Sequence, residues 1–470
     1  MNLIQDVMPW SKKHLSQFQR KDLLVLFEVD PSVEQDQSIP ITHLMVLIYS
    51  KTHQNVNLND YRQRYALVEW YLSIGEKSFA IDHLVTLLDT DNTFLNRDEL
   101  TKEKTGVNIV GYARSLTGLG EDVRTIIHTI ENLGIPFCTI SLRHISDSAI
   151  YSCVVNETYF PRYSTSIFCM NIIEYQKFVA NFDNMDAFGH IILQAPWELP
   201  RLPVEFIHAV QTVNEFWAIS TFVESALIEA NLTNVSHVYP AIETVKVQPN
   251  VTHLVQKKPF TFLYIFDAGS YLTRKNPLGL ITAFQRAFYN NEEVLLLLKV
   301  SNAKNNDEYS TLKSACSADN RIKLIEQQLN KPELTSLYSK ADCYVSLHRS
   351  EGFGRTIAEA AMHNLPIIAT SWSGSNDIIP PNSELLVSFE LKPLAEMDYP
   401  FSKDQIWAEP NLNHASELMA QVYEMSESDR LSMGEENCKY VLSRFSPERA
   451  QQQISSLLEP RFSPQKVNEN

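Results

Sequence analysis

The sequence lacks the features of a membrane-spanning or secreted protein. No apolar run reaches the ~18–20 residues that a helix needs to cross a bilayer. Residues 1–24 have no basic start, apolar centre and small-residue cleavage site of the kind found in secretory signals. We therefore expect a cytoplasmic protein, and its hydrophobic fraction of 44% and charged fraction of 20% are typical of globular chains.

Paired cysteines, metal-ligand clusters and a basic surface are also missing. The six cysteines form no Cys-x-x-Cys pair, so the sequence indicates neither a disulfide framework nor a zinc ribbon. An Asp-x-Asp pair in "LLDTDNT" (87–93) lies among turn formers, and we interpret it as a polar loop rather than a metal site. We expect no metal cofactor. The net charge of −16 argues against nucleic-acid binding, although it allows a local basic pocket for phosphate.

Hydrophobic periodicity divides the chain into four parts. Residues 1–104 carry apolar residues at helical spacing and predict a helical N-terminal extension. Residues 105–250 and 258–440 each alternate short apolar runs with amphipathic helices, which predicts two α/β domains with doubly wound parallel sheets. The polar stretch 246–259 is interpreted as a linker, and 441–470 as a C-terminal helix and tail.

Twelve apolar runs are predicted as strands. Several in the second domain lack polar alternation, as strands buried on both faces do. The predicted strands are 107–112, 137–142, 166–171, 190–195, 216–220 and 235–240 in the first domain, and 260–267, 294–301, 322–326, 343–348, 366–370 and 384–389 in the second.

The stretch "HRSEGFGRTIAEAAMHNLPIIATSWSGSND" contains two glycine-containing corners, each after a predicted strand. Ligands of open parallel sheets bind beyond the carboxyl ends of the strands. Gly352 and Gly354 let backbone N–H groups approach a ligand, and the helix predicted to start near Thr356 directs its positive end to the same place. Ser373 and Gly374 expose amides in the second corner. The two corners together favour a shared anionic ligand.

Two carboxylates accompany the first corner. Glu351 precedes the helix and Glu359 lies about one turn inside it, so they could accept hydrogen bonds from two hydroxyl pairs of one extended ligand. An alternative reading stays open, in which Glu359 compensates the helix dipole and Glu351 is an exposed loop residue.

Three cations are predicted at the same edge of the sheet. Arg274 and Lys275 follow the first strand of the second domain, just before a helix with Pro277 near its start. Lys299 ends the next strand inside an apolar run and needs a polar partner. The alternative is that Arg274 and Lys275 are solvated and that Lys299 snorkels to water.

Candidate residues in or near the first domain are less specific. Gly118 and Gly120 lie between a strand and a helix, a pattern that also suits a dinucleotide. No acidic residue follows the second strand, where a nicotinamide dinucleotide would need one to bind its ribose. A dehydrogenase is therefore less favoured. His190 begins a predicted strand and is explained as a structural residue, whereas Glu198 lies in a proline-bounded loop beyond a strand end.

The stretch around Glu351 resembles the signature of retaining glycosyltransferases of family 4, whose Glu-x7-Glu motif would here be Glu351 and Glu359. "GVNIVGYARSLTGLGEDVR", "APWELPRLP", "NEFWAIS" and "YLTRKNP" resemble the subgroup that acts on bacterial surface polysaccharides. The resemblance covers about residues 106–445. It implies a GT-B fold, in which two Rossmann-like domains face each other across a cleft, the second binding a nucleotide-sugar and the first the acceptor.

The resemblance also implies roles for individual residues. Glu351 would contact hydroxyls of the donor sugar, Glu359 would contact the ribose, and Lys275 with Arg274 would neutralise the diphosphate, so Glu351, Lys275 and Arg274 form the catalytic set. Many members carry a Gly-Arg pair that "FDAGSYLTRKN" lacks, and Lys299 could supply that charge. The expected donor-binding set is Glu359, Lys299, Gly352, Phe353, Gly354, Arg355, Thr356, Gly118, Gly120, Ser373 and Gly374. The resemblance also implies a polar residue on the acceptor side, for which Glu198, Arg114 and His190 are the candidates.

The function expected from this resemblance is a metal-independent, retaining hexosyltransferase. It would move a sugar from a nucleoside diphosphate sugar to a glycan or lipid-linked acceptor in cell-surface polysaccharide or lipopolysaccharide synthesis. A sugar-nucleotide epimerase and a non-catalytic nucleotide-sugar-binding protein remain alternatives. The basic and aromatic residues of "WSKKHLSQFQRK" (10–21) suggest a peripheral contact with the acceptor or with the inner face of the cytoplasmic membrane.

Overall fold

The fold is described from a computed structural model. It describes residues 26, 30, 41–53, 57–71, 105–142, 154–158, 161–181, 185–242, 259–303, 307–396 and 398–462. The predictions for 10–21, for the Asp-x-Asp pair at 87–93 and for most of the linker lie outside these residues. Across the described helices, none is long and apolar enough to cross a membrane.

The chain forms two compact units. One comprises Met1–Met170, Glu174–Leu193 and Arg461–Asn470, and the other comprises Asn171–Ile173 and Gln194–Pro460. In the N-terminal region, where the sequence predicts helices, the described residues form α3 (His43–Thr52) and α4 (Tyr61–Trp70). Thr42 caps α3, because its side chain accepts a hydrogen bond from the Met45 amide.

The first sheet has six strands in the order β2-β1-β3-β4-β5-β6. Strand β1 pairs in parallel with both β2 and β3, and β5 pairs in parallel with β6. The bounds are β1 Val107–Gly111, β2 Phe137–Ser141, β3 Thr165–Cys169, β4 His190–Gln194, β5 Glu215–Ala218 and β6 Val235–His237, with helices α7 Gly118–Asn132, α8 Ile172–Asn181 and α9 Thr221–Glu229 and short 3-10 turns η5 Met185–Phe188, η6 Val204–Phe206 and η7 Ala209–Thr212.

Helix α7 shows why the spacing of apolar residues predicts a helix in this region. Its apolar side chains Val123, Ile126, Ile127 and Ile130 recur at helical spacing and are buried. Gly134, with φ 67°, follows the C-cap residue Leu133 and ends the helix.

The second sheet also has six strands, in the order β12-β11-β10-β7-β8-β9, and every neighbouring pair is parallel. The bounds are β7 Phe260–Asp267, β8 Val294–Ser301, β9 Ile322–Ile325, β10 Cys343–Ser346, β11 Ile367–Thr370 and β12 Leu386–Val387. All twelve predicted strands are therefore present, and the prediction of an α/β fold with two parallel sheets is confirmed.

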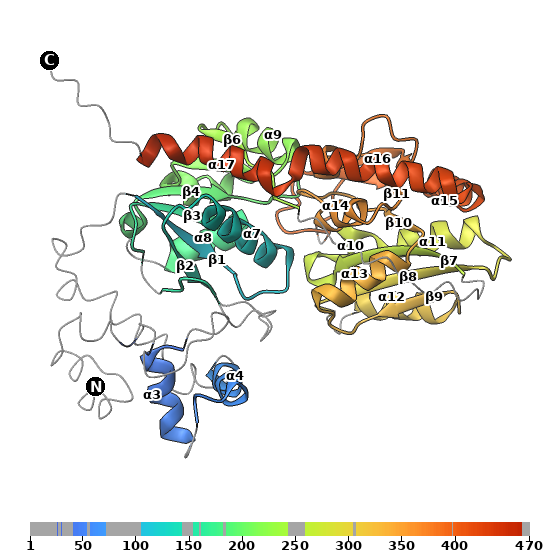
Figure 1. The fold of residues 1–470 in the computed structure, drawn as a ribbon. Coiled ribbons are helices and arrows are strands. Elements are labelled where there is room, and N and C mark those ends of the chain that lie inside the picture. Colours follow the sequence, from blue (N-terminus) through green and yellow to red (C-terminus); the bar gives the residue numbers. More distant parts are fainter. Residues whose placement is uncertain are drawn as a thin grey trace. The chain divides into compact units, whose positions relative to one another are not determined.

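Helices cover both faces of the second sheet. Figure 1 shows α12 and α13 along β7–β9, and α14 beside β10 and β11. The helical elements are η8 Ala268–Ser270, α10 Leu272–Lys275, α11 Pro277–Ala287, α12 Asp307–Ser317, α13 Lys331–Lys340, α14 Arg355–Met362, η9 Ser373–Asp377, α15 Leu412–Glu424, α16 Glu427–Phe445 and α17 Pro447–Phe462. The C-terminal helix predicted within 441–470 corresponds to α17.

The strand order locates the functional edge of the second sheet. β7 lies in the middle, β8 and β9 extend to one side, and β10, β11 and β12 extend to the other. The order reverses between β7 and β10, and ligands of such sheets bind outside the carboxyl ends of the strands at this switch point. The segments that follow β7 and β10 are therefore the first place to look for a site.

One element was not predicted. Strands β13 (Phe389–Pro393) and β14 (Ile406–Pro410) form an antiparallel hairpin after β12, joined by residues 394–405. β13 is largely exposed, and its sequence "FELKP" lacks the apolar run by which buried strands are recognised.

Candidate active site at the switch point of the second sheet

The segment after β7 is shaped by two left-handed residues. Tyr271 (φ 64°) precedes the short helix α10, and Asn276 (φ 54°) separates α10 from α11. The Asn276 side chain accepts a hydrogen bond from the Gly279 amide and donates one to the carbonyl of Leu347 at 2.9 Å. Because Leu347 directly follows β10, this contact joins the two segments that flank the switch point.

Glu351 is the centre of the resulting cluster. Its Oε1 lies 2.5 Å from Nζ of Lys275, and its Oε2 lies 3.2 Å from Nη1 of Arg274. The Glu351 side chain is only 13% exposed, so the alternative of an exposed loop residue is wrong. The sequence expectation that Glu351, Arg274 and Lys275 share one edge of the sheet is confirmed.

Arg274 is buried at 2% exposure and contacts two carboxylates and one carbonyl. Its Nη1 donates to the carbonyl of Ser350 at 2.7 Å, and its Nη2 lies 3.8 Å from Oε1 of Glu198. Ser350 Oγ in turn donates to the carbonyl of Glu198. The loop that carries Glu198 is therefore fixed beside Glu351 in the same compact unit, and the alternative of a solvated Arg274 is wrong.

Burial and opposite charges act against each other on the pKa values of this cluster. Burial alone would raise the pKa of Glu351, but Lys275 and Arg274 outweigh it and lower the pKa to about 2. Burial acts in the opposite sense on Lys275 and lowers its pKa, which Glu351 opposes. Two cations and the two carboxylates of Glu351 and Glu198 sum to zero charge.

Backbone hydrogen bonds join the two predicted corners. The Glu351 amide donates to Oγ of Ser373 at 2.8 Å, and the Gly374 amide donates to the Glu351 carbonyl at 2.9 Å. A Cβ at Gly374 would lie 2.1 Å from the carbonyl oxygen of Gly352, so only glycine permits this approach. The corners after β10 and β11 thus form one continuous wall.

A buried histidine links strand β10 to the second of these corners. His348 has no exposed surface, and its Nδ1 and Nε2 lie 2.9 Å from Oγ of Ser346 and of Ser375, respectively. Burial is the main cause that lowers the pKa of His348 to about 4. The ring is therefore neutral at pH 7 and bridges strand β10 to the second corner.

This burial predicts an acid sensitivity. The unfolded ring titrates near pH 6.5, so between pH 6.5 and 4 the unfolded chain binds more protons than the folded chain. We expect His348 to lower the free energy of unfolding by roughly 3 kcal/mol between pH 7 and pH 4. Denaturant unfolding measures this effect. Between pH 7 and pH 4 the free energy of unfolding should fall less in His348→Gln than in the parent, while the exposed His128→Gln should show the same pH dependence as the parent. The same pH dependence of the free energy of unfolding in all three proteins would contradict the role of His348 in acid sensitivity.

Helix α14 begins at the first corner. Gly354 has φ 102° and caps the helix, so Arg355 and Thr356 open its first turn. Glu359 lies one turn inside, as predicted, where its Oε2 accepts a hydrogen bond from the buried Tyr338 hydroxyl at 2.9 Å. Phe353 is buried against Phe445 of α16, with ring centroids 5.3 Å apart.

Lys299 lies at the carboxyl end of β8. It is 2% exposed, and its Nζ donates to the carbonyl of Val300 at 2.6 Å and lies 3.2 Å from Oγ of Ser301. Burial lowers its pKa, while Asp267 at the end of β7 opposes this effect. The snorkelling alternative is wrong, because the ammonium group bonds within the protein.

The remaining candidates belong to the other compact unit. Gly118 opens α7, and a Cβ at Gly120 would lie 2.1 Å from the Ser115 carbonyl oxygen. Arg114 pairs with Glu157 at 2.5 Å, and His190 begins β4.

Several residues of the site carried no sequence signal. Tyr399 donates to Oε2 of Glu198 at 2.7 Å from a position 201 residues away. Tyr338 and His348 act on Glu359 and on the second corner, but each sits in an apolar pattern that reads as core. Among the described residues, no group of three or more His, Cys, Asp or Glu side chains could hold a metal ion.

Part of the chain matches a known family. Residues 252–392 match the family model of glycosyl transferases group 1, a region that covers less than a third of the 470 residues. The match contains β7 to β12 and therefore both glycine-containing corners, Arg274, Lys275, Glu351 and Glu359. No curated protein sequence matches the chain.

Solved structures of similar fold were found at low identity. Sucrose-phosphate synthase from Thermosynechococcus elongatus is 13% identical, with a TM-score of 0.55 over 76% of this chain and 99% of that chain. The lipopolysaccharide outer core galactosyltransferase WaaB is 14% identical, with a TM-score of 0.51 over 76% and 99%. Anabaena HepE in complex with UDP-glucose is 13% identical, with a TM-score of 0.51 over 76% and 100%. The fold of this chain is that of GT-B glycosyltransferases.

Longer proteins match only over part of their length. The chain spans 55% of the Staphylococcus aureus TarM chain, to which it is 12% identical with a TM-score of 0.46 over 62% of this chain.

Proposed function

We propose that the chain is a retaining glycosyltransferase of family 4 that moves a hexose from a nucleoside diphosphate sugar to a saccharide acceptor. The observation that carries this proposal is Glu351, held between Lys275 and Arg274 at the switch point beside two joined amide-containing corners. The group 1 match over residues 252–392 and the UDP-glucose bound to HepE support a nucleotide-sugar donor.

The charges suit the cleavage of a glycosyl phosphate bond. Departure of the diphosphate leaves negative charge on oxygen and positive charge on the sugar ring. The corner amides, the N-terminus of α14 and Lys275 stabilise the leaving group, and Glu351 faces the sugar. A diphosphate oxygen then takes the proton of the acceptor hydroxyl on the same face, so the anomeric configuration is retained without a protein base. The proposed reaction uses no metal, because the corner amides and the positive end of α14 act on the leaving diphosphate together with Lys275.

The acceptor is proposed to be a glycan or a lipid-linked saccharide of cell-surface polysaccharide or lipopolysaccharide synthesis. The likeness in fold to WaaB, named as a lipopolysaccharide outer core galactosyltransferase, supports this class. Such an acceptor places the protein in the cytoplasm, at the inner face of the membrane.

The test is a turnover assay with UDP-, GDP-, ADP- and dTDP-hexoses, each with and without EDTA. We expect one donor family to raise the melting temperature and to be hydrolysed slowly without acceptor, in EDTA as in its absence. NMR of the released sugar should show the anomer of the donor. An altered sugar still attached to its nucleotide would indicate an epimerase, and binding without turnover would indicate a binding protein. Loss of turnover in EDTA that Mn²⁺ or Mg²⁺ restores would contradict metal independence.

Glu359 is proposed to bind the ribose of the donor. Glu359→Gln should weaken binding of the nucleoside diphosphate by roughly 1.5–3 kcal/mol, because a hydrogen bond to a charged acceptor is lost. Tyr338→Phe, which removes the hydroxyl that orients Glu359, should have a smaller effect in the same direction. Calorimetry with the nucleoside diphosphate measures both, and Glu424→Gln on the exposed surface of α15 serves as the control. Unchanged affinity in Glu359→Gln would exclude the ribose contact.

A further inference from the structure

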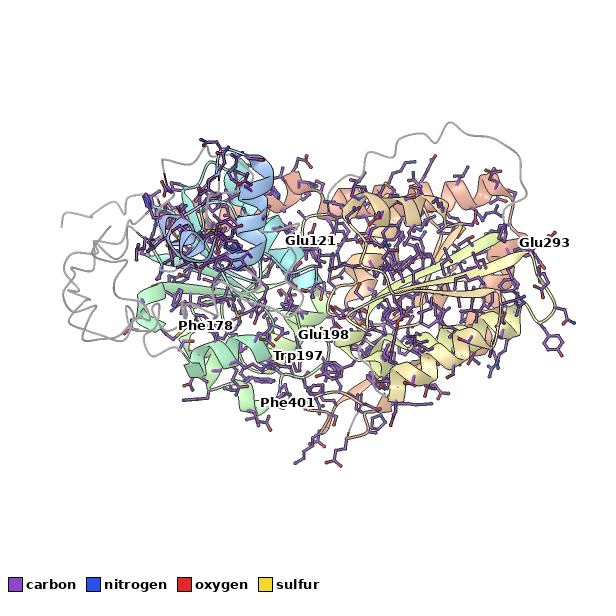
Figure 2. All side chains as sticks on the ribbon, turned by 90° about the horizontal axis from the view of Figure 1, so that it is seen from below. Glu121, Phe178, Trp197, Glu198, Glu293 and Phe401 are labelled. Atoms are coloured by element: carbon purple, nitrogen blue, oxygen red, sulfur yellow. The ribbon has the colours of Figure 1, made fainter. Side chains whose placement is uncertain are left out.

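The connection between β13 and β14 places a tyrosine into the site. This connection packs on the loop that carries Trp197 and Glu198. The side-chain Nε2 of Gln405 donates to the Arg201 carbonyl at 2.8 Å, and the Phe401 and Phe206 rings lie 4.6 Å apart. Figure 2 shows Trp197, Glu198 and Phe401 together, at the end of the second sheet opposite Glu293, the residue just before β8.

Within this connection, Tyr399 contacts both a carboxylate and a second aromatic ring. Its hydroxyl donates to Oε2 of Glu198 at 2.7 Å, and its ring lies 4.8 Å from the ring of Tyr271. Tyr399 is buried, whereas Tyr271 is 42% exposed. Tyr271 also has φ 64° and ψ 108°, a strained backbone for a bulky residue, and such strain is concentrated at functional sites.

We propose that Tyr271, Tyr399 and Glu198 form a subsite for an uncharged sugar ring next to Glu351. This inference rests on the proposed function and adds the residues that recognise the sugar. The exposed Tyr271 ring offers an apolar face to the C–H face of a sugar, and the Glu198 carboxylate accepts from its hydroxyls. A few placed polar groups beside aromatic surface are typical of small-ligand sites.

Glu198 has acceptor capacity beyond its contacts within the protein. A carboxylate offers about four acceptor positions. Tyr399 uses one of them, Arg274 lies 3.8 Å from the other oxygen, and the side chain is 24% exposed. Arg274 also contacts Glu351, so the subsite and the proposed catalytic carboxylate share one buried guanidinium.

The charge of the cluster decides what kind of sugar fits. The positive charge of Arg274 and Lys275 is already balanced by Glu351 and Glu198. An acidic sugar at Glu198 would meet a carboxylate of the same sign, which costs binding energy. A neutral hexose is therefore favoured over a uronic acid or a phosphorylated sugar.

The subsite also lies partly outside the shared family region. The group 1 match ends at residue 392, and Tyr399 follows it in the connection between β13 and β14. The subsite thus combines Tyr271, which lies inside the matched region, with Tyr399, which lies beyond it.

The experiment compares Tyr271→Ala with Tyr271→Phe, which keeps the ring, and with Tyr289→Ala, which removes an 83% exposed tyrosine elsewhere. Tyr399→Phe keeps the buried ring and removes only the hydroxyl bond to Glu198. Calorimetry measures binding of UDP-, GDP-, ADP- and dTDP-hexoses and of the matching nucleoside diphosphates. Saturation-transfer NMR measures binding of methyl hexosides and of methyl glucuronide.

We expect Tyr271→Ala and Tyr399→Phe to lose at least fivefold in affinity for a sugar-bearing ligand, while Tyr271→Phe and Tyr289→Ala keep it. If the loss appears for nucleotide-sugar but not for nucleoside diphosphate, the ring belongs to the donor. If it appears only for methyl hexosides, the ring belongs to the acceptor. Unchanged affinities in both assays, or stronger binding of methyl glucuronide than of methyl hexosides, would overturn the subsite. If no nucleotide binds the parent protein, the proposed function fails, and the methyl hexoside assay still decides the subsite.

Discussion

Glu351→Gln is expected to lower kcat by about 100-fold or more, while affinity for the nucleoside diphosphate stays equal or rises. The substitution removes the negative charge that faces the developing positive charge of the sugar, an interaction that strengthens in the transition state. It also releases Lys275 and Arg274 from their carboxylate, at 2.5 and 3.2 Å in the parent, so that they can contact a diphosphate.

Initial rates with the donor measure kcat, and calorimetry with the nucleoside diphosphate measures its affinity. Glu409→Gln is a matched control, because Glu409 pairs with Arg349 at 2.7 Å, two residues before Glu351. That control should keep its rate within a few-fold. If Glu351→Gln instead lost diphosphate affinity and kept kcat, its role would be donor anchoring; if neither changed, this corner would not be the donor site.

Arg274→Met is expected to destabilise the chain by about 3–5 kcal/mol. The guanidinium is 2% exposed and lies between Glu351 and Glu198, so its removal leaves two carboxylates close together without their shared partner. It also removes the donor to the Ser350 carbonyl. Denaturant unfolding measures the loss, and Arg286→Met, which replaces an exposed arginine on α11, should change stability by less than about 0.5 kcal/mol.

A double-mutant cycle separates charge from packing. With Glu351→Gln already present, Arg274→Met should cost clearly less than it does in the parent, because one of the two stranded carboxylates is then neutral. Equal costs in both backgrounds would mean that Arg274 stabilises the chain through packing and its carbonyl contact alone. In that case the ion pair with Glu351 would contribute little to folding.

The sequence predicted regular elements well where burial imposes a period. Strands such as β7, β8 and β10 are mainly apolar because both faces of a parallel sheet are covered, and α7 buries apolar side chains at every third or fourth position. The hairpin β13–β14 was missed for the same reason, since its exposed first strand has no such period.

The sequence also located the main residues of the site. Glu351, Arg274 and Lys275 each follow a predicted strand, and the carboxyl ends of parallel strands meet at one edge of the sheet. The eight-residue spacing placed Glu359 one turn inside α14, where it is found. These predictions needed only strand ends and helical periodicity, which are local properties of the chain.

Only the tertiary structure decided which charged and polar side chains pair with one another. Arg274 contacts Glu351 77 positions later in the chain, and Tyr399 reaches Glu198 across 201 positions. The sequence offered Arg274 and Lys275 as diphosphate ligands and Glu198 as an isolated acceptor candidate. It could not show that they form one neutral cluster, because pairing depends on strand order and on the packing of a hairpin that has no pattern of its own. Local period determines the elements, and long-range packing determines their partners.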